Sequence, residues 1–106
     1  MKKNIVIFAS GTGSNFINIY NRVKSNDIYG KVCLLVSNNK NCGAIQFASN
    51  NNLDYFIYND KRFPLDKDSE ELIKKIIDCN TDLILLAGYI KKISIKLIHL
   101  FKNKIM

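Results

Sequence analysis

Apolar runs that suit β-strands alternate along the chain with segments whose apolar residues recur at helical spacing. Strand character is found at residues 4–10, 31–37, 53–58 and 82–88. Helix signals lie between and after these runs, at residues 16–24, 43–50, from residue 68 onward and at 94–101. Strands that alternate with helices pair in parallel through right-handed crossovers. The pattern therefore predicts an α/β fold with a doubly wound parallel sheet in the strand order 3-2-1-4.

Helical spacing also predicts which side chains face the core. Those expected to be buried are Phe16, Ile19, Tyr20 and Val23 on the first helix, Ala44, Phe47 and Ala48 on the second, and Leu72, Ile73, Ile76 and Ile77 on the third. Asp68 and Glu71 have the spacing of a capping box, so we expect them to begin the third helix. Ser94 is expected to cap the last helix.

The length of the chain predicts one domain, residues 1–106. The segment 59–67 carries the single proline, Pro64, and is expected to be a surface loop. Residues 104–106 begin another apolar stretch. We therefore expect a sheet that is truncated after the fourth strand and its helix, where a fifth strand starts.

The distribution of apolar residues argues against a membrane protein or a secreted one. No apolar run reaches the roughly 18 residues that span a bilayer. The basic start, Met1-Lys2-Lys3, is followed by a run from Ile5 to Ala9 that is too short for a signal peptide. The expected compartment is the cytoplasm, with no membrane partner.

The net charge of +7 raises the question of nucleic-acid binding. Fourteen of the sixteen basic residues are lysines, and they are scattered along the chain rather than clustered. No arginine cluster or alternation of aromatic and basic residues accompanies them. We interpret them as a solvated surface and expect no nucleic-acid partner.

The cysteines do not have the spacing of a metal site. Cys33, Cys42 and Cys79 lie far apart in the sequence and form no Cys-x-x-Cys pair, and the chain has one histidine. Structural zinc sites need clustered ligands, and disulfide frameworks are normally even in number. We expect the three cysteines to be small buried hydrophobic side chains in a protein of a reducing compartment, and we expect no bound metal.

The first strand leads directly into a glycine-rich turn, in NIVIFASGTGSN. The dinucleotide fingerprint fails because Phe16 stands where it needs a small residue, and because no acid follows the second strand, which ends Val36-Ser37-Asn38-Asn39. The P-loop pattern fails because no Gly-Lys-Ser/Thr triplet occurs. A flavodoxin-like receiver domain would have acidic residues after the first strand, and Ala9-Ser10-Gly11 has none.

A short loop for one terminal phosphate remains. Gly11 and Gly13 allow positive φ and let backbone amides approach a ligand. Ser14 and Asn15 add a hydroxyl and an amide where the helix dipole is positive. The alternative is a strand-to-helix turn that binds nothing and needs glycine only for its backbone.

Three blocks resemble glycinamide ribonucleotide formyltransferase, the folate-dependent enzyme of purine synthesis. They are NIVIFASGTGSN, VSNNK after the second strand and LAGYIKKIS after the fourth. The blocks follow the family's order and spacing, and the resemblance covers the whole chain. The SGxGSN loop separates this family from methionyl-tRNA formyltransferase, whose fold is similar. The resemblance implies a Rossmann-like formyltransferase fold, of which this chain would be the amino-terminal part.

The resemblance also implies the roles of site residues. Gly13, Ser14 and Asn15 would hold the phosphate of glycinamide ribonucleotide, and the segment after the fourth strand would line the pterin pocket of 10-formyltetrahydrofolate. The residues of that segment are Ile90, Lys91, Lys92 and Ile93. The family commonly reads AGFMRILS where this chain reads AGYIKKIS, so lysines replace an arginine and an apolar residue. For a further basic contact, Arg62 is a loose candidate and Leu65 the strict positional match.

The family's catalytic groups are an Asn and a His in an Asn-x-His-Pro motif after the fifth strand, and a later Asp. None of them is expected within residues 1–106. His99 falls on the last helix opposite Ile95, Ile98 and Phe101, on the expected solvent side. We therefore expect the substrate-phosphate-binding half of the enzyme with no catalytic residue. The alternatives are a non-catalytic phosphate-ligand-binding module of flavodoxin-like fold, and the relic of a degraded gene.

Overall fold

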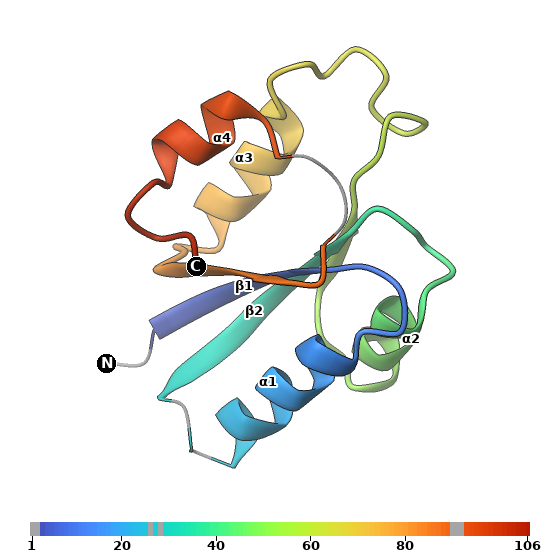
Figure 1. Cartoon of the computed structure of the whole chain (residues 1–106), viewed down its shortest axis with the longest axis vertical. Helices are drawn as coiled ribbons and strands as arrows, with labels where there is room; N and C mark the ends of the chain where they lie inside the picture. The colour runs from blue at the N-terminus through green and yellow to red at the C-terminus, as the bar shows by residue number, and fades with distance from the viewer. Residues whose placement is uncertain (1–2, 26, 28, 90–92) are drawn as a thin grey trace.

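The computed structural model describes residues 3–25, 27, 29–89 and 93–106, and its centre is a parallel sheet. The strands are β1 (Lys3–Ala9), β2 (Gly30–Ser37), β3 (Tyr55–Ile57) and β4 (Leu83–Ala87). Their order across the sheet is β3-β2-β1-β4, and every pair is parallel. Figure 1 shows β1 beside β2, with helices on both sides of the sheet. The predicted topology and strand order are confirmed.

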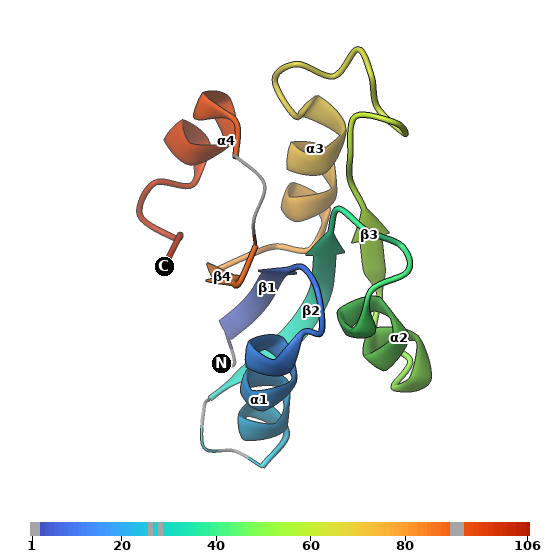
Figure 2. The ribbon, with the colours of Figure 1, turned by 45° about the vertical axis from the view of Figure 1, so that its right-hand side comes forward.

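The described residues form four helices, and these cover the two faces of the sheet (Figure 2). They are α1 (Ser14–Lys24), α2 (Gly43–Asn50), α3 (Glu70–Asp78) and α4 (Ile95–Leu100). One core contains Phe16, Val23 and Ala44 from α1 and α2. The core on the opposite face contains Leu72 and Leu97 from α3 and α4. The sheet therefore separates two apolar cores.

Alternation along β1 divides its side chains between these cores. Ile5, Ile7 and Ala9 belong to the core under α1 and α2. Val6 and Phe8 belong to the core under α3 and α4. All five side chains are at most 1% exposed. Strand side chains point alternately to opposite faces, so a central strand covered on both sides must be apolar throughout.

Cys33 is an extra residue in β2. Ile5 pairs with Val32 and Val6 pairs with Leu34, so the register shifts at Cys33. The Cys33 thiol donates a hydrogen bond to the Ile5 carbonyl oxygen over 3.3 Å. Burial, followed by the neighbouring Cys79, raises the pKa of Cys33 to about 12.

The three cysteines are free thiols, but they are not equally buried. Cys42 is buried as expected, whereas Cys33 and Cys79 are half-buried at the edge of the core under α3 and α4. The prediction of buried side chains is thus wrong for two of the three. In the described part of the chain, no three His, Cys, Asp or Glu residues gather as metal ligands.

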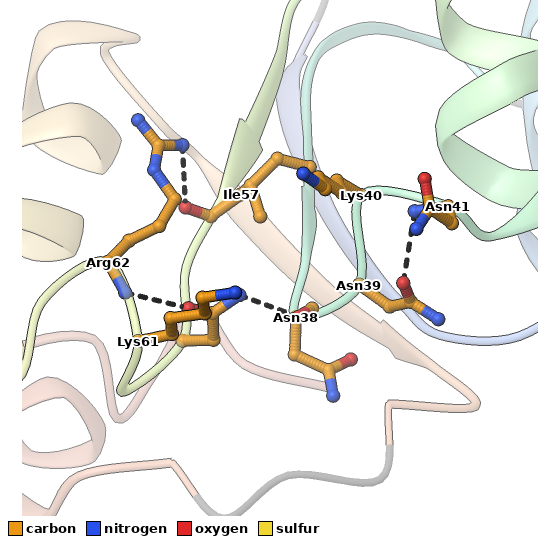
Figure 3. Close-up of a pocket in the computed structure, with 8 residues that line it drawn as sticks. Asn38, Asn39, Lys40, Asn41, Ile57, Lys61 and Arg62 are labelled. Carbon is orange, nitrogen blue, oxygen red and sulfur yellow. Dashed lines mark hydrogen bonds between the residues drawn. The ribbon is translucent and has the colours of Figure 1, made fainter.

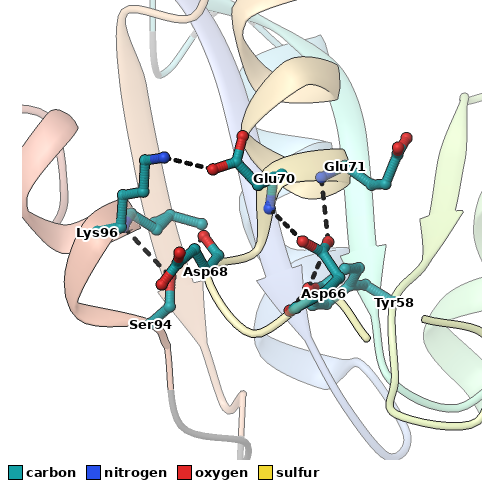
Figure 4. Close-up of polar contacts among 8 residues, drawn as sticks. Tyr58, Asp66, Asp68, Glu70, Glu71, Ser94 and Lys96 are labelled. Atoms are coloured by element: carbon teal, nitrogen blue, oxygen red, sulfur yellow. Dashed lines mark hydrogen bonds and ion pairs between the residues drawn. The ribbon is translucent and has the colours of Figure 1, made fainter. Parts of the chain in front are cut away.

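The cap of α3 differs from the predicted capping box. Ser69 precedes the helix with a positive φ of 59° and makes no side-chain cap. Instead, the Asp66 carboxylate accepts hydrogen bonds from the amides of Glu70 at 2.7 Å and Glu71 at 3.0 Å (Figure 4). The Tyr58 hydroxyl donates to the same carboxylate at 2.9 Å. The loop folds back far enough for Asp66 to take the role predicted for Asp68.

The expected burial of side chains on α3 and α4 is wrong in two further cases. Ile77 is 57% exposed in the last turn of α3, whose buried residues are Leu72, Ile73 and Ile76. On α4, the buried residue is Leu97, whereas Ile95 and Ile98 are 85% and 47% exposed. Ser94 does cap α4, since its hydroxyl accepts from the Leu97 amide over 3.2 Å. An exposed ion pair between Lys96 and Glu70 joins the two helices.

The residues after α4 return to the sheet beside β4. Phe101 is buried, as expected, and Ile105 forms a parallel bridge with Ile84. The Ile84 amide donates to the Lys104 carbonyl over 2.7 Å, and the Met106 amide donates back to Ile84 over 2.9 Å. The predicted start of a fifth strand is therefore present as one bridge. None of the helices among the described residues combines the length and apolar character needed to span a bilayer.

Candidate functional site

The loops that follow the parallel strands meet at one edge of the sheet. The chain leaves β1 for α1 on one face, and it leaves β4 for α4 on the other (Figure 2). Since β1 and β4 are neighbours, their loops separate at the carboxyl edge of the strands, which is where open α/β sheets bind ligands. The glycine loop, residues 10–15, follows β1 at this edge, and Gly88 and Tyr89 follow β4.

The glycine loop has the backbone that its sequence predicts. Gly11 and Gly13 have positive φ angles of 65° and 75°. Gly13 is the N-cap of α1 and provides no side-chain cap, and its carbonyl accepts the first helical hydrogen bond from Ile17. Among the described residues, no hydrogen bond uses the amides of Ser14 and Asn15. Both residues are exposed, so the positive end of the helix has free donors.

The loop is held by close packing against the start of α2, which the sequence did not indicate. A Cβ on Gly13 would lie 2.7 Å from the Ala44 Cβ, and one on Gly43 would lie 2.7 Å from the Thr12 carbonyl oxygen. The Ala44 amide donates to the Gly11 carbonyl over 3.4 Å. Gly43 and Ala44 therefore position the loop. The only available signal was a glycine at the first position of the second predicted helix.

The VSNNK block connects the loops after three strands. The Ser10 hydroxyl, at the end of β1, donates to the Asn38 side-chain oxygen over 2.7 Å. The Asn59 side chain, after β3, donates to the Asn38 carbonyl over 2.9 Å. Asn59 in turn accepts from the Arg62 amide over 2.9 Å. Asn38 is thus hydrogen-bonded both to the end of β1 and to the loop before α3.

The segment after β4 begins with a second positive-φ glycine, Gly88, at 74°. Tyr89 then packs edge-on against Phe8, with ring centroids 5.2 Å apart. Burial raises the pKa of Tyr89 to about 12, so its hydroxyl remains a proton donor at neutral pH. Tyr89 packs against the core on the face that carries α3 and α4.

The structure accounts for only part of the predicted pterin segment. Ile90, Lys91 and Lys92 lie outside the described residues. Ile93 is half-buried and lines a cavity of about 380 Å³ under the loop before α3. Of the two candidates for a basic contact, Leu65 is 89% exposed, and Arg62 donates from its guanidinium to the Ile57 carbonyl over 3.0 Å.

His99 lies on the exposed side of α4, as predicted. Its neighbours at the helix surface, Ile98 and Leu100, are exposed as well. The predicted phosphate ligands, Gly13 to Asn15, come from the opposite face of the sheet. The structure therefore separates the chain's only histidine from the glycine loop.

Comparison with known proteins decides the family. The family model described as formyl transferase matches residues 3–106. The chain belongs to the formyl transferase family. A solved structure of glycinamide ribonucleotide transformylase 1 from Geobacillus kaustophilus superposes on this formyl transferase chain with a TM-score of 0.92 at 30% identity. The match covers 99% of this chain and 56% of that one.

Two curated relatives carry the name phosphoribosylglycinamide formyltransferase. The chloroplastic protein of Arabidopsis thaliana is 36% identical over 107 residues, which cover 99% of this formyl transferase chain and 37% of the relative. The protein of Bacillus subtilis is 30% identical over 105 residues, which cover 98% of the chain and 54% of the relative. The chain thus spans about a third to a half of the length of these relatives and corresponds to their amino-terminal part.

Proposed function

We propose that this chain acts in the transfer of a formyl group from 10-formyltetrahydrofolate to glycinamide ribonucleotide, in de novo purine synthesis. Its relatives in a plant and in a bacterium are both named for formyl transfer to phosphoribosylglycinamide. The observation that carries the proposal is the glycine loop, whose helix start has free amides and no side-chain cap. The substrate's phosphate is the group that this feature suits.

The phosphate is assigned to Gly13, Ser14 and Asn15. A dianion at this position would accept from the exposed amides and from the Ser14 hydroxyl and Asn15 amide group. Charge-assisted hydrogen bonds contribute about 1.5–3 kcal/mol each. The helix dipole adds up to about 2 kcal/mol. The donors of the glycine loop are therefore sufficient to bind the phosphate, without a contribution from the net charge of the chain.

The folate is assigned to the segment that follows β4. The resemblance places the pterin against Ile90, Lys91, Lys92 and Ile93, and Tyr89, which precedes them, is half-buried against Phe8. The folate supplies the formyl group. The role of this segment is to hold the folate at attack distance from the substrate amine, which the glycine loop positions through the phosphate.

No catalytic residue is assigned to this chain. Attack of the amine on the formyl carbon develops a negative charge on the formyl oxygen, which needs hydrogen-bond donors. The chain's one histidine, His99, is exposed on α4, and α4 packs on the face of the sheet opposite the one that carries the glycine loop's helix. The resemblance implies that the family's Asn, His and Asp come after the fifth strand, outside residues 1–106. We propose that these 106 residues contribute binding without chemistry, and that they are inactive alone.

The phosphate assignment is tested by calorimetry with glycinamide ribonucleotide. We expect Asn15→Ala and Ser14→Ala each to weaken binding about tenfold or more, the loss of one charge-assisted hydrogen bond. Asn18→Ala is the matched control, because Asn18 is exposed on the same helix one turn further on. Equal affinities for Asn15→Ala, Asn18→Ala and the unchanged chain would contradict the assignment.

The enzymatic proposal has a separate test, which also addresses the alternative of a non-catalytic binding module. The chain is assayed for formyl transfer by itself and joined to the carboxyl-terminal half of the Bacillus subtilis relative. We expect activity only in the joined protein. A joined protein that binds glycinamide ribonucleotide but transfers no formyl group favours the binding module. Turnover by the chain alone, abolished by Asn15→Ala, would show that its catalytic residues were missed.

A further inference from the structure

A second cavity opens between the loops that follow β2 and β3. Its volume is about 580 Å³, within the range of small-molecule sites. Lys40 borders it from the β2 loop, and Lys61 and Arg62 border it from the β3 loop (Figure 3). Ile57 contributes the apolar part of the lining. Neither the glycine loop nor the segment after β4 contributes a residue to this lining.

The topology explains why the cavity forms here. The chain leaves β2 for α2, which packs on the face that carries α1. It leaves β3 for α3, which packs on the opposite face. Since β2 and β3 are neighbours in the sheet, their loops separate just as those of β1 and β4 do. Ligands of open α/β sheets bind where adjacent loops diverge at the carboxyl edge.

The lining of the cavity is positively charged. It contains the three cations Lys40, Lys61 and Arg62 and no aspartate or glutamate. The remaining polar residues are asparagines, which donate as well as accept hydrogen bonds. Within the described ranges, the one ion pair is Lys96–Glu70, so no carboxylate is paired with the three cations of the cavity. Clefts lined by one sign of charge concentrate ligands of the opposite sign.

Two hydrogen bonds order the lining of the cavity, and one of them joins the two loops. Asn59 donates to the Asn38 carbonyl over 2.9 Å and so joins one loop to the other. The Arg62 guanidinium donates to the Ile57 carbonyl over 3.0 Å and lies 5.4 Å from the Phe63 ring centroid. Arg62 is therefore fixed, with further N–H donors to spare. A cavity with fixed donors loses little entropy when a ligand binds.

We propose that this cavity binds an organic anion with at least two negative groups, carboxylates or phosphates. Three cations match two or more charges, and the volume is far larger than one inorganic phosphate occupies. Lys40 and Lys61, on opposite loops, contact the charged groups, while Ile57 accommodates the carbon body. This site is separate from the phosphate loop, and Arg62 is the one residue of its lining that is also a candidate for the basic contact implied by the resemblance.

The test is an NMR titration of the isotopically labelled full chain, with citrate as the carboxylate probe and pyrophosphate as the phosphate probe. Sodium chloride of equal ionic strength is the blank. We expect saturable shifts at the amides of residues 38–41 and 59–62 with at least one probe. Lys40→Gln and Lys61→Gln should each weaken that binding about tenfold.

Lys74→Gln is the matched control, because Lys74 is exposed on α3 and its loss changes the net charge equally. Its affinity should equal that of the unchanged chain. Equal weakening by Lys74→Gln, shifts confined to residues 11–15, or shifts that do not saturate would each overturn the proposal. The spectra themselves show whether every variant is folded. A response to citrate alone or to pyrophosphate alone identifies which anionic group the cavity selects.

Discussion

At the scale of single residues, two glycines with the same backbone have different structural roles. Gly11 and Gly13 both have positive φ, and the sequence predicts both as turn residues of a phosphate loop. A Cβ on Gly11 would meet nothing within 4 Å, whereas one on Gly13 would overlap Ala44. Gly11 is therefore needed only for its backbone angle, and Gly13 is needed also for the approach of α2.

This difference predicts unequal costs for the same substitution. Gly11→Ala should destabilise the chain by about 1 kcal/mol, since only the left-handed backbone disfavours a Cβ. Gly13→Ala should cost about 1–3 kcal/mol more, because the loop and α2 must move apart. Urea unfolding of the two variants and the unchanged chain measures both costs. Equal free energies of unfolding for the two variants would mean that the contact with Ala44 does not constrain the loop.

At the scale of elements, the start of α3 depends on a residue four positions before the helix. Asp66 accepts from the amides of Glu70 and Glu71 and from the Tyr58 hydroxyl. Burial raises the pKa of Tyr58, so the hydroxyl remains a donor at neutral pH. One carboxylate thus connects the end of β3 to the next helix, and the loop between them has a defined shape.

We expect Asp66→Ala to destabilise the chain by about 1–2 kcal/mol, the cost of losing a helix cap. Asp68→Ala is the control: Asp68 is exposed and contributes only its main-chain carbonyl, which the variant keeps. Its effect should stay within about 0.5 kcal/mol. Thermal or urea unfolding distinguishes the two variants. If Asp68→Ala lowered the free energy of unfolding more than Asp66→Ala, the result would support the capping box that the sequence predicted.

At the scale of the whole molecule, protection from solvent decreases from β1 to the edges of the sheet. β1 pairs with β2 on one side and β4 on the other, and its residues Ile5–Ala9 are buried. β3 has three residues and one paired neighbour. Leu86 on β4 is 42% exposed, and residues 104–106 cover only part of this strand.

We therefore expect amide hydrogen exchange to be slowest at Ile5–Phe8 and clearly faster at Tyr55–Ile57. Exchange in β1 requires the sheet to open on both sides, whereas β3 can separate from β2 alone. Exchange measured by NMR at neutral pH reports both strands in one experiment. Protection of β3 equal to that of β1 would show that the sheet opens only as one cooperative unit.

The sequence by itself determined the architecture, because strand and helix periodicity are local properties of the chain. The apolar run in β1, the spacing on α1 and the free helix start at Gly13 follow from neighbouring residues, and all are found in the structure. The blocks around Ser14 and Asn15 also determined the family, which the match over residues 3–106 confirms. The roles of individual site residues remain predictions.

Contacts between distant residues were decided only by the tertiary structure. The contact of Gly13 with Ala44 depends on how two helices pack, and the cap by Asp66 depends on how a loop folds back. Helical spacing placed Ile95 and Ile98 inward, but the position of α4 on the sheet buries Leu97 instead. The charged cavity between Lys40 and Lys61 joins residues 21 positions apart, through loops that diverge because their helices cover opposite faces. No local pattern contains that information, since it arises when the sheet assembles.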